Sequence, residues 1–106
     1  MQIIIIGSGA SGLAAGISLL WCGDDVTILE RNNISGKKIL LTGAGRCNYF
    51  NNDQNIAHYH SSDKEILEKI ITSDNIKLVE NFITSLGIVP KVKDGYYYPF
   101  SNQAYN

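Results

Sequence analysis

Cysteine is scarce in this sequence, and its two positions exclude a disulfide-stabilised secreted domain. Cys22 and Cys47 are the only cysteines among 106 residues, whereas small secreted domains use several to compensate for a small core. Neither lies in a Cys-x-x-Cys pair, and His58 and His60 add no spacing typical of structural zinc. We therefore expect two free thiols, a reducing compartment and no metal site.

An excess of charge of one sign and long apolar runs are also lacking. Nine basic and ten acidic residues leave a formal net charge of −1, which gives no indication of a nucleic-acid or membrane partner. The apolar start has no basic residue before it and is interrupted by Gly7, unlike a secretory signal. No other stretch approaches the roughly 20 apolar residues of a membrane span. The sequence therefore predicts a soluble, cytoplasmic protein with one small core.

The N-terminal part carries the pattern of one strand–helix–strand unit. Residues 3–6 are a continuous β-branched run, typical of a strand buried on both faces of a parallel sheet. Residues 7–12 form a glycine-rich turn, residues 13–21 favour a helix that Gly23 ends, and residues 26–30 favour a second strand. We expect parallel strands joined by a right-handed crossover.

Two helices with apolar faces are expected in the middle of the chain. Ser62, with a glutamate three positions later, is the predicted N-cap of the first. Ser73 or Asp74 is the predicted N-cap of the second, and Gly87 its end. Neither helix is needed in a minimal doubly wound sheet, so we interpret them as an insert.

The remaining segments predict a hairpin and an irregular stretch. Asp94-Gly95, between apolar residues 88–93 and 96–100, is a strong hairpin signal. Residues 37–52 contain a glycine-broken stretch and predict an extended or irregular segment near the first glycine turn. Residues 99–106 resemble a strand that leads into a helix start, so we expect a fragment of a longer protein.

The glycine turn has the spacing of a dinucleotide-binding motif. Gly7, Gly9 and Gly12 match GxGxxG after a strand and before a helix, and Glu30 ends the second strand 18 residues after Gly12. In such motifs the first glycine permits the tight turn, the second admits the pyrophosphate and the third lets the helix approach the sheet. The acid accepts hydrogen bonds from the ribose and disfavours NADP. The motif does not distinguish FAD from NAD.

A second motif is more distinctive. Residues 36–48 read Gly-Lys-Lys-Ile-Leu-Leu-Thr-Gly-Ala-Gly-Arg-Cys-Asn. With the first motif, this segment resembles the BaiN/RdsA family of FAD-dependent oxidoreductases, which includes aminoacetone-oxidase-like flavoproteins. Residues 94–102 are similar to a third family segment, with Tyr96 where arginine is usual. The resemblance covers essentially all of residues 1–106.

The resemblance implies a fold and a set of site residues. The fold is α/β: a Rossmann-like FAD-binding βαβ unit with a two-helix insert and a β-hairpin, forming the N-terminal, incomplete part of an FAD/NAD(P)-binding domain of a larger two-domain flavoprotein. FAD would place its adenosine at Glu30, its pyrophosphate on the glycine turn and its isoalloxazine near residues 45–48. The implied cofactor-binding residues are Gly7, Ser8, Gly9, Ala10, Ser11, Gly12, Glu30, Arg31, Lys38, Thr42, Gly43, Gly45, Arg46, Cys47 and Asn48.

Several of these residues leave two interpretations open. Lys38 could neutralise phosphate charge or could be a solvated loop residue. Arg46 and Asn48 could donate to flavin carbonyl oxygens or could belong to a structural network. Cys47 is either a redox thiol or a small residue packed beside the flavin. The lack of a second nearby cysteine favours the packing role.

The favoured function is FAD-dependent oxidation or reduction of a small molecule, with NADH or NADPH as candidate reductant. The sequence identifies neither the substrate nor a catalytic acid or base. A non-catalytic sensor of NAD or FAD is the alternative. A flavoprotein that modifies RNA ranks last, because the basic and aromatic patterning of RNA binding is absent. Alone, residues 1–106 are expected to be inactive and to retain FAD weakly.

Overall fold

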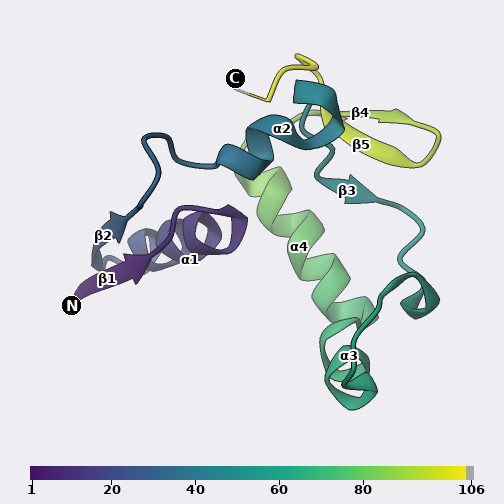
Figure 1. The fold of residues 1–106 in the computed structure, drawn as a ribbon, viewed down its shortest axis with the longest axis horizontal. Coiled ribbons are helices and arrows are strands. Elements are labelled where there is room, and N and C mark those ends of the chain that lie inside the picture. The colour runs from purple at the N-terminus through teal and green to yellow at the C-terminus, as the bar shows by residue number, and fades with distance from the viewer. Residues whose placement is uncertain (105–106) are drawn as a thin grey trace. The chain divides into compact units, whose positions relative to one another are not determined.

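The computed structural model describes residues 1–104, which form two compact units. The first unit is Met1–Cys47 together with the segment that starts at Gln103, and the second is Asn48–Asn102 (Figure 1). The helix start predicted for the end of the chain falls partly on residues 105–106, which lie outside the described residues. No helix within residues 1–104 combines the length and the apolar character needed to cross a membrane.

The first unit confirms the predicted strand–helix–strand arrangement. Strand β1 (Gln2–Ile6), helix α1 (Ala10–Trp21) and strand β2 (Asp25–Leu29) follow one another, and helix α2 (Lys37–Gly45) comes next. The two strands are parallel and pair from Gln2 with Asp25 to Ile6 with Leu29. This register places the carboxyl ends of both strands at one edge, directly before the glycine turn and before Glu30.

Helix α1 lies close to the sheet because it presents a glycine there. Gly16 is buried, and a Cβ atom at this position would lie 3.0 Å from Cδ1 of Ile28 and 3.6 Å from Cδ1 of Ile5. An alanine here would require the end of the Ile28 side chain to shift by a few tenths of an ångström, so the position favours glycine. The alternating side chains of β1 and β2 that face α1 are half-buried, as expected for strands with one covered face.

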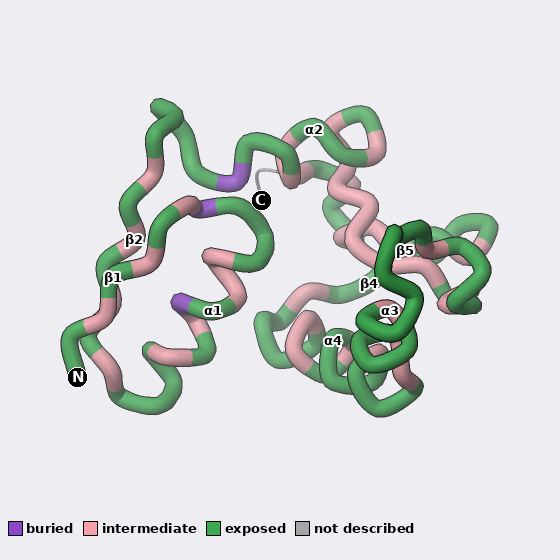
Figure 2. The backbone as a smooth tube through the Cα atoms, turned by 60° about the horizontal axis from the view of Figure 1, so that its bottom comes forward, coloured by how far each residue is buried: buried purple, intermediate pink, exposed green. Residues whose placement is uncertain are grey.

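The prediction that β1 is buried on both faces is wrong for the described residues. The exposed fractions are 61% for Ile4, 80% for Ile6 and 51% for Leu29. The physical reason is that this sheet has two strands and contacts a helix on one face only. The expected hydrophobic core is also absent from the described residues, of which those classed as buried are Ser8, Gly16 and Gly36 (Figure 2).

Helix α2 corrects the expectation of an irregular segment after residue 37. Its first turn is helical, whereas Thr42 is extended and Gly43 and Ala44 have left-handed backbone angles. The predicted proximity to the glycine turn is confirmed, because the backbone N–H of Gly36 donates to the carbonyl of Ser8 at 2.8 Å. The apolar residues 39–41 thus lie in the helical turn, which ends before the left-handed Gly43.

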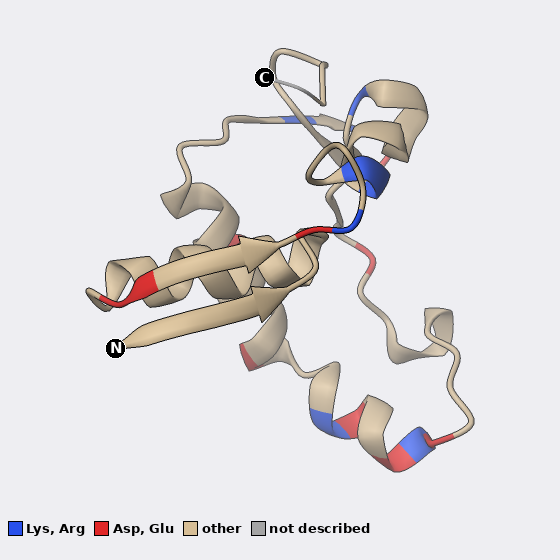
Figure 3. Cartoon of the chain, turned by 60° about the vertical axis from the view of Figure 1, so that its left-hand side comes forward, with Lys and Arg blue, Asp and Glu red and all other residues tan. Residues whose placement is uncertain are grey.

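The second unit contains the two helices and a three-stranded antiparallel sheet. Its strands pair in the order β3 (Phe50–Asn51), β5 (Tyr96–Pro99) and β4 (Pro90–Lys93). Asp94 and Gly95 have φ angles of 52° and 81°, the positive values that a tight hairpin turn requires, so the hairpin is confirmed. Helix α3 (Lys64–Ile70) carries both acidic and basic side chains (Figure 3). The elements are β3 (Phe50–Asn51), η1 (Ile56–His58), α3 (Lys64–Ile70), α4 (Ser73–Ser85), β4 (Pro90–Lys93) and β5 (Tyr96–Pro99).

The predicted helix caps are displaced by one or two residues. The N-cap of α3 is Asp63, not Ser62, and its carboxylate accepts from the backbone N–H of Ile66 at 3.1 Å. The N-cap of α4 is Thr72, not Ser73 or Asp74. Adjacent polar residues all suit an N-cap by type, so the geometry of the chain entering the helix decides between them. Gly87 follows α4 with a φ of 77°, which confirms the predicted end.

We expect the Asp63→Ala substitution to lower the free energy of unfolding by about 1 kcal/mol, because it removes the side-chain acceptor of the first turn of α3. Ser62→Ala is the matched control and should change this quantity by less than about 0.5 kcal/mol. Urea denaturation of both variants measures the difference. A larger loss for Ser62→Ala than for Asp63→Ala would contradict the observed cap.

Candidate functional site

The glycine turn joins β1 to α1 through two constrained glycines. Gly7 has a φ of 95°, and its N–H donates to the carbonyl of Leu29 at 2.7 Å. A Cβ atom on Gly12 would lie 2.0 Å from the carbonyl oxygen of Gly7. The contacts of the chain itself therefore explain two glycines of the motif: one by its backbone angle and one by the close approach of helix and turn.

Gly9, the middle glycine, has no such explanation within the chain. Its φ and ψ of −73° and −175° are accessible to any residue, and a Cβ atom there would meet nothing within 4 Å. Gly9 is also the N-cap of α1, and no side chain caps this helix. The first N–H groups of α1, at Ala10, Ser11 and Gly12, thus lie at the positive end of the helix dipole beside an open glycine.

Glu30 is held by hydrogen bonds on both carboxylate oxygens. Its Oε2 accepts from the backbone N–H and from the hydroxyl of Ser8, each at 2.8 Å. Its Oε1 accepts from the backbone N–H of Asn32 at 2.7 Å and from the Asn32 side-chain amide at 2.8 Å. Ser8 is only 1% exposed. The acid at the end of β2 thus bridges the glycine turn and the following loop.

These bonds favour the charged form of Glu30. The backbone N–H of Asn32, followed by the backbone N–H and hydroxyl of Ser8, lowers the pKa of the Glu30 carboxyl from 4.5 to about 2. Partial burial opposes this shift but does not outweigh it. At neutral pH the mouth of the parallel strands therefore carries a fixed negative charge beside the amide groups of the turn.

Residues 42–47 form a left-handed loop after the helical turn of α2. Gly43, Ala44 and Gly45 have φ angles of 58°, 55° and 83° in succession. The loop is closed by backbone hydrogen bonds from Cys47 to Thr42 at 3.0 Å and from Arg46 to Gly43 at 3.3 Å. A left-handed Ala is strained, so the loop is maintained by its own hydrogen bonds and not by local preference.

Arg46 and Cys47 are both held within this loop. The Arg46 Nε–H donates to the carbonyl of Gly43 at 2.9 Å. Burial raises the pKa of the Cys47 thiol, and a hydrogen bond with Thr42 opposes the shift only in part. A raised pKa reduces the thiolate fraction on which redox reactivity depends.

The structure brings together some predicted site residues and leaves others apart. The glycine turn, Ser8 and Glu30 form one connected site. Arg31 directly follows Glu30 in the loop after β2, and Lys38 is exposed in the first turn of α2. Asn48 belongs to the second unit, and turning over its side-chain amide allows the nitrogen to donate to the carbonyls of Phe50 and Tyr97 at 3.2 and 3.3 Å.

The prediction from sequence omitted Asn32. A signal was present, because Asn at a loop start often bonds nearby backbone or side-chain groups. The sequence does not specify which partner such a residue takes. Only the folded loop shows that the partner is the carboxylate of Glu30.

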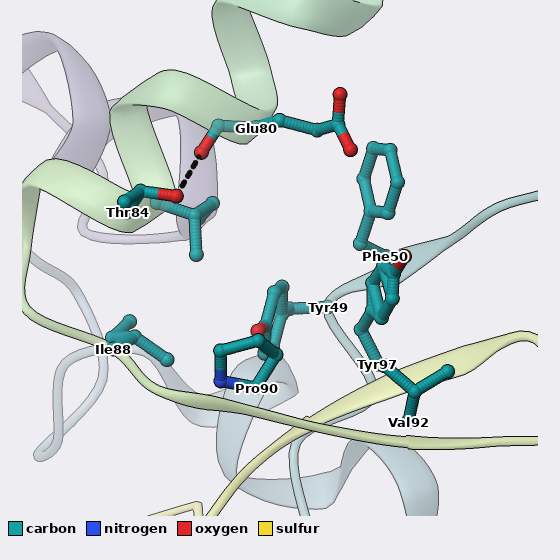
Figure 4. Close-up of a pocket in the computed structure, with 9 residues that line it drawn as sticks. Tyr49, Phe50, Glu80, Thr84, Ile88, Pro90, Val92 and Tyr97 are labelled. Carbon is teal, nitrogen blue, oxygen red and sulfur yellow. Dashed lines mark hydrogen bonds between the residues drawn. The ribbon is translucent and has the colours of Figure 1, made fainter.

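A separate pocket lies in the second unit between α4 and the sheet. It has a volume of about 170 Å³. The rings of Phe50 and Tyr97 are stacked with centroids 5.2 Å apart, and Glu80 extends toward Phe50 (Figure 4). Tyr97 therefore packs within the hairpin sheet. The lining residues are Tyr49, Phe50, Glu80, Ile83, Thr84, Ile88, Pro90, Val92 and Tyr97.

Of the two histidines before α3, His58 contacts an aspartate, and no larger cluster of metal-ligating side chains is present among the described residues. His58 Nε2 lies 2.9 Å from Asp53 Oδ2, and this contact lowers the pKa of the Asp53 carboxyl. Within residues 1–104 there is no group of three or more His, Cys, Asp or Glu side chains able to hold a metal ion.

Comparison with known proteins identifies similar sequences along the whole chain. The family described as HI0933-like protein Rossmann domain matches residues 1–106. The 3-dehydro-bile acid delta(4,6)-reductase of Clostridium scindens is 41% identical over 105 residues, which are 97% of this chain and 26% of that protein. A ribosomal RNA dihydrouridine synthase of Haemophilus influenzae is 39% identical over 80 residues, which are 72% of this chain and 20% of that protein.

A shorter match has the same name as the second relative. The ribosomal RNA dihydrouridine synthase of Escherichia coli is 40% identical over 48 residues, which are 45% of this chain and 12% of that protein. The matched segments thus cover 26%, 20% and 12% of the length of these relatives, and the chain spans about a quarter of the reductase.

The two glycines of the turn should respond differently to alanine. We expect Gly12→Ala to lower the free energy of unfolding by about 3 kcal/mol, because its Cβ atom would overlap the carbonyl of Gly7. Gly9→Ala should change this free energy by less than about 1 kcal/mol, since its backbone is extended and its surroundings are open. Urea denaturation compares the variants. Equal losses would contradict the packing described for the turn.

The Glu30 carboxylate should make stability pH-dependent. Because its pKa is lowered on folding, its contribution is fully present above pH 4.5 and is lost as the pH falls toward 2. We expect urea denaturation to show a steeper loss for the wild type than for Glu30→Gln between these pH values. Glu68→Gln, at an exposed position of α3, is the control and should follow the wild type. Parallel curves for the wild type and Glu30→Gln would rule out the inferred bonds.

Proposed function

The chain belongs to the HI0933-like Rossmann domain family, the BaiN/RdsA family of flavin-dependent oxidoreductases, and on this premise we propose that it binds the ADP part of FAD in a reductase. The resemblance recognised from the two sequence motifs is confirmed at the level of the family, and so is the Rossmann-like fold. The cofactor, the site residues and the substrate of the intact protein remain parts of the proposal.

The observation that carries the proposal is the open backbone at Gly9. Nothing in the chain within 4 Å would contact a side chain there, so the space beside the first turn of α1 is open to a ligand. The uncapped N-terminus of α1 beside it suits an anion such as a pyrophosphate. Gly7, Ser8, Ala10, Ser11 and Gly12 would contribute backbone N–H groups or shape to the same site.

Glu30 would hold the adenosine ribose. A charged carboxylate accepts hydrogen bonds from sugar hydroxyls and repels a 2′-phosphate, so FAD or NAD fits better than NADP. Arg31 and Lys38 follow in the sequence and would add positive charge toward phosphate groups. Their position near the end of β2 and in the first turn of α2 is compatible with this role.

The left-handed loop would lie against the flavin. The residues that would contribute are Thr42, Gly43, Gly45, Arg46 and Cys47, while the role of Asn48 stays a prediction from the resemblance. Glycine backbone passes close to a flat ring without steric conflict. Flavin, when bound, supplies hydride transfer. Arginine near the ring stabilises negative charge on it.

Reduction is the direction suggested by the relatives. One is named a reductase, and the product in the other name, dihydrouridine, is a reduced base. The test uses the intact purified protein without oxygen. Loss of its visible flavin absorbance on adding NADH or NADPH is expected. A colourless protein that binds NAD would favour a sensor.

Reduction of an RNA base is the second candidate function, favoured by the names of two relatives. Those matches cover 20% and 12% of the relatives, and the sequence lacks a basic excess. Anaerobic reoxidation of the reduced protein separates the candidates. A small-molecule reductase would be reoxidised by an α,β-unsaturated ketone. An enzyme that reduces an RNA base would be reoxidised by unmodified ribosomal RNA.

Gly9→Ala should weaken ADP binding at least tenfold, a loss of about 1.4 kcal/mol, because the new methyl group points into the space proposed for the phosphates. Adenosine, which lacks phosphates, should bind the variant and the wild type alike. Calorimetric or NMR titration measures both ligands. Unchanged ADP affinity would contradict the proposed pyrophosphate position.

A further inference from the structure

The Glu30 carboxylate has no acceptor site left for an added sugar hydroxyl. A carboxylate offers about four lone-pair sites, and four donors of the chain already occupy them. Any ligand hydroxyl that bonds to Glu30 must therefore displace one of these donors or share its site.

The four donors differ in how easily they can leave. Two are backbone N–H groups, fixed by the glycine turn and by the loop after β2. The Ser8 hydroxyl belongs to a residue that is 1% exposed, and the Ser8 carbonyl accepts from Gly36, so this residue is held on both sides. The Asn32 side-chain amide is exposed and can turn into water without breaking other contacts that the structure shows.

We propose that the Asn32 side chain is a displaceable latch on Glu30: its amide occupies the acceptor site on Oε1 that a ribose hydroxyl takes when a nucleotide binds. This inference rests on the proposed function and adds a residue that sets the affinity of the same site. The Asn32 backbone N–H, the Ser8 N–H and the Ser8 hydroxyl keep the carboxylate oriented during the exchange. The Asn32 side-chain amide thus competes with the ribose hydroxyl for one acceptor site on Glu30.

If the Asn32 amide competes with the nucleotide, removing this polar side chain should improve ADP binding. In Asn32→Ala the competing amide is gone, while the backbone N–H remains. We expect ADP to bind about threefold to tenfold more tightly, the effect of no longer breaking one exposed hydrogen bond. Asn33→Ala, the same substitution at the next loop residue, is the matched control and should leave the affinity unchanged.

The experiment is an NMR titration of the protein with ADP and with 2′,3′-dideoxy-ADP, which measures weak and strong binding alike. The gain in Asn32→Ala should be present with ADP and absent with the dideoxy nucleotide. In the free protein, the pKa of Glu30 should rise in Asn32→Ala and not in Asn33→Ala. Unchanged or weaker ADP binding by Asn32→Ala, or an equal gain with the dideoxy nucleotide, overturns the latch alone. Failure of the wild type to bind ADP overturns the latch together with the proposed function.

Discussion

The bonds between Ser8 and Glu30 are the constraint on which the candidate site depends. They join the turn after β1 to the end of β2, so the two loops at the mouth of the parallel strands have one geometry. The almost complete burial of Ser8 and the hydrogen bond from Gly36 to its carbonyl extend this connection to the start of α2. The carboxylate that bonds to the turn is also a hydrogen-bond acceptor suited to sugar hydroxyls, so the residue that shapes the site is also the residue proposed to bind the ribose.

The two motifs are constructed in different ways. In the glycine turn of residues 7–12, Gly7 is required by its backbone angle and Gly12 by the close approach of helix and turn. No side chain caps the helix that follows. In the second, three successive left-handed residues are closed by backbone hydrogen bonds, and Ala44 adopts an angle that suits glycine better. Strain of this kind persists only where the surrounding bonds determine the backbone, and it often marks functional loops. Both motifs therefore expose backbone groups in arrangements that ordinary helices and strands do not provide.

The described residues of both units form no apolar interior of the kind that usually stabilises a domain. None of the large hydrophobic side chains of the described residues is fully buried, and Ile4, Ile6 and Leu29 are largely exposed on the uncovered face of the first sheet. Apolar surface left in water contributes nothing to folding stability. The helix caps and the carboxylate bridge are held by local hydrogen bonds.

The sequence by itself determined the elements whose cause is local. The glycine spacing with Glu30, the parallel strand–helix–strand unit and the Asp94-Gly95 hairpin follow from backbone angles and residue periodicity, and all are present. The tertiary structure decided what depends on competing partners: Asp63 and not Ser62 caps α3, Asn32 bonds to Glu30, and residues 37–41 are helical. It also decided which faces stay uncovered, because burial depends on how many elements surround a strand, and no pattern within the strand contains that number.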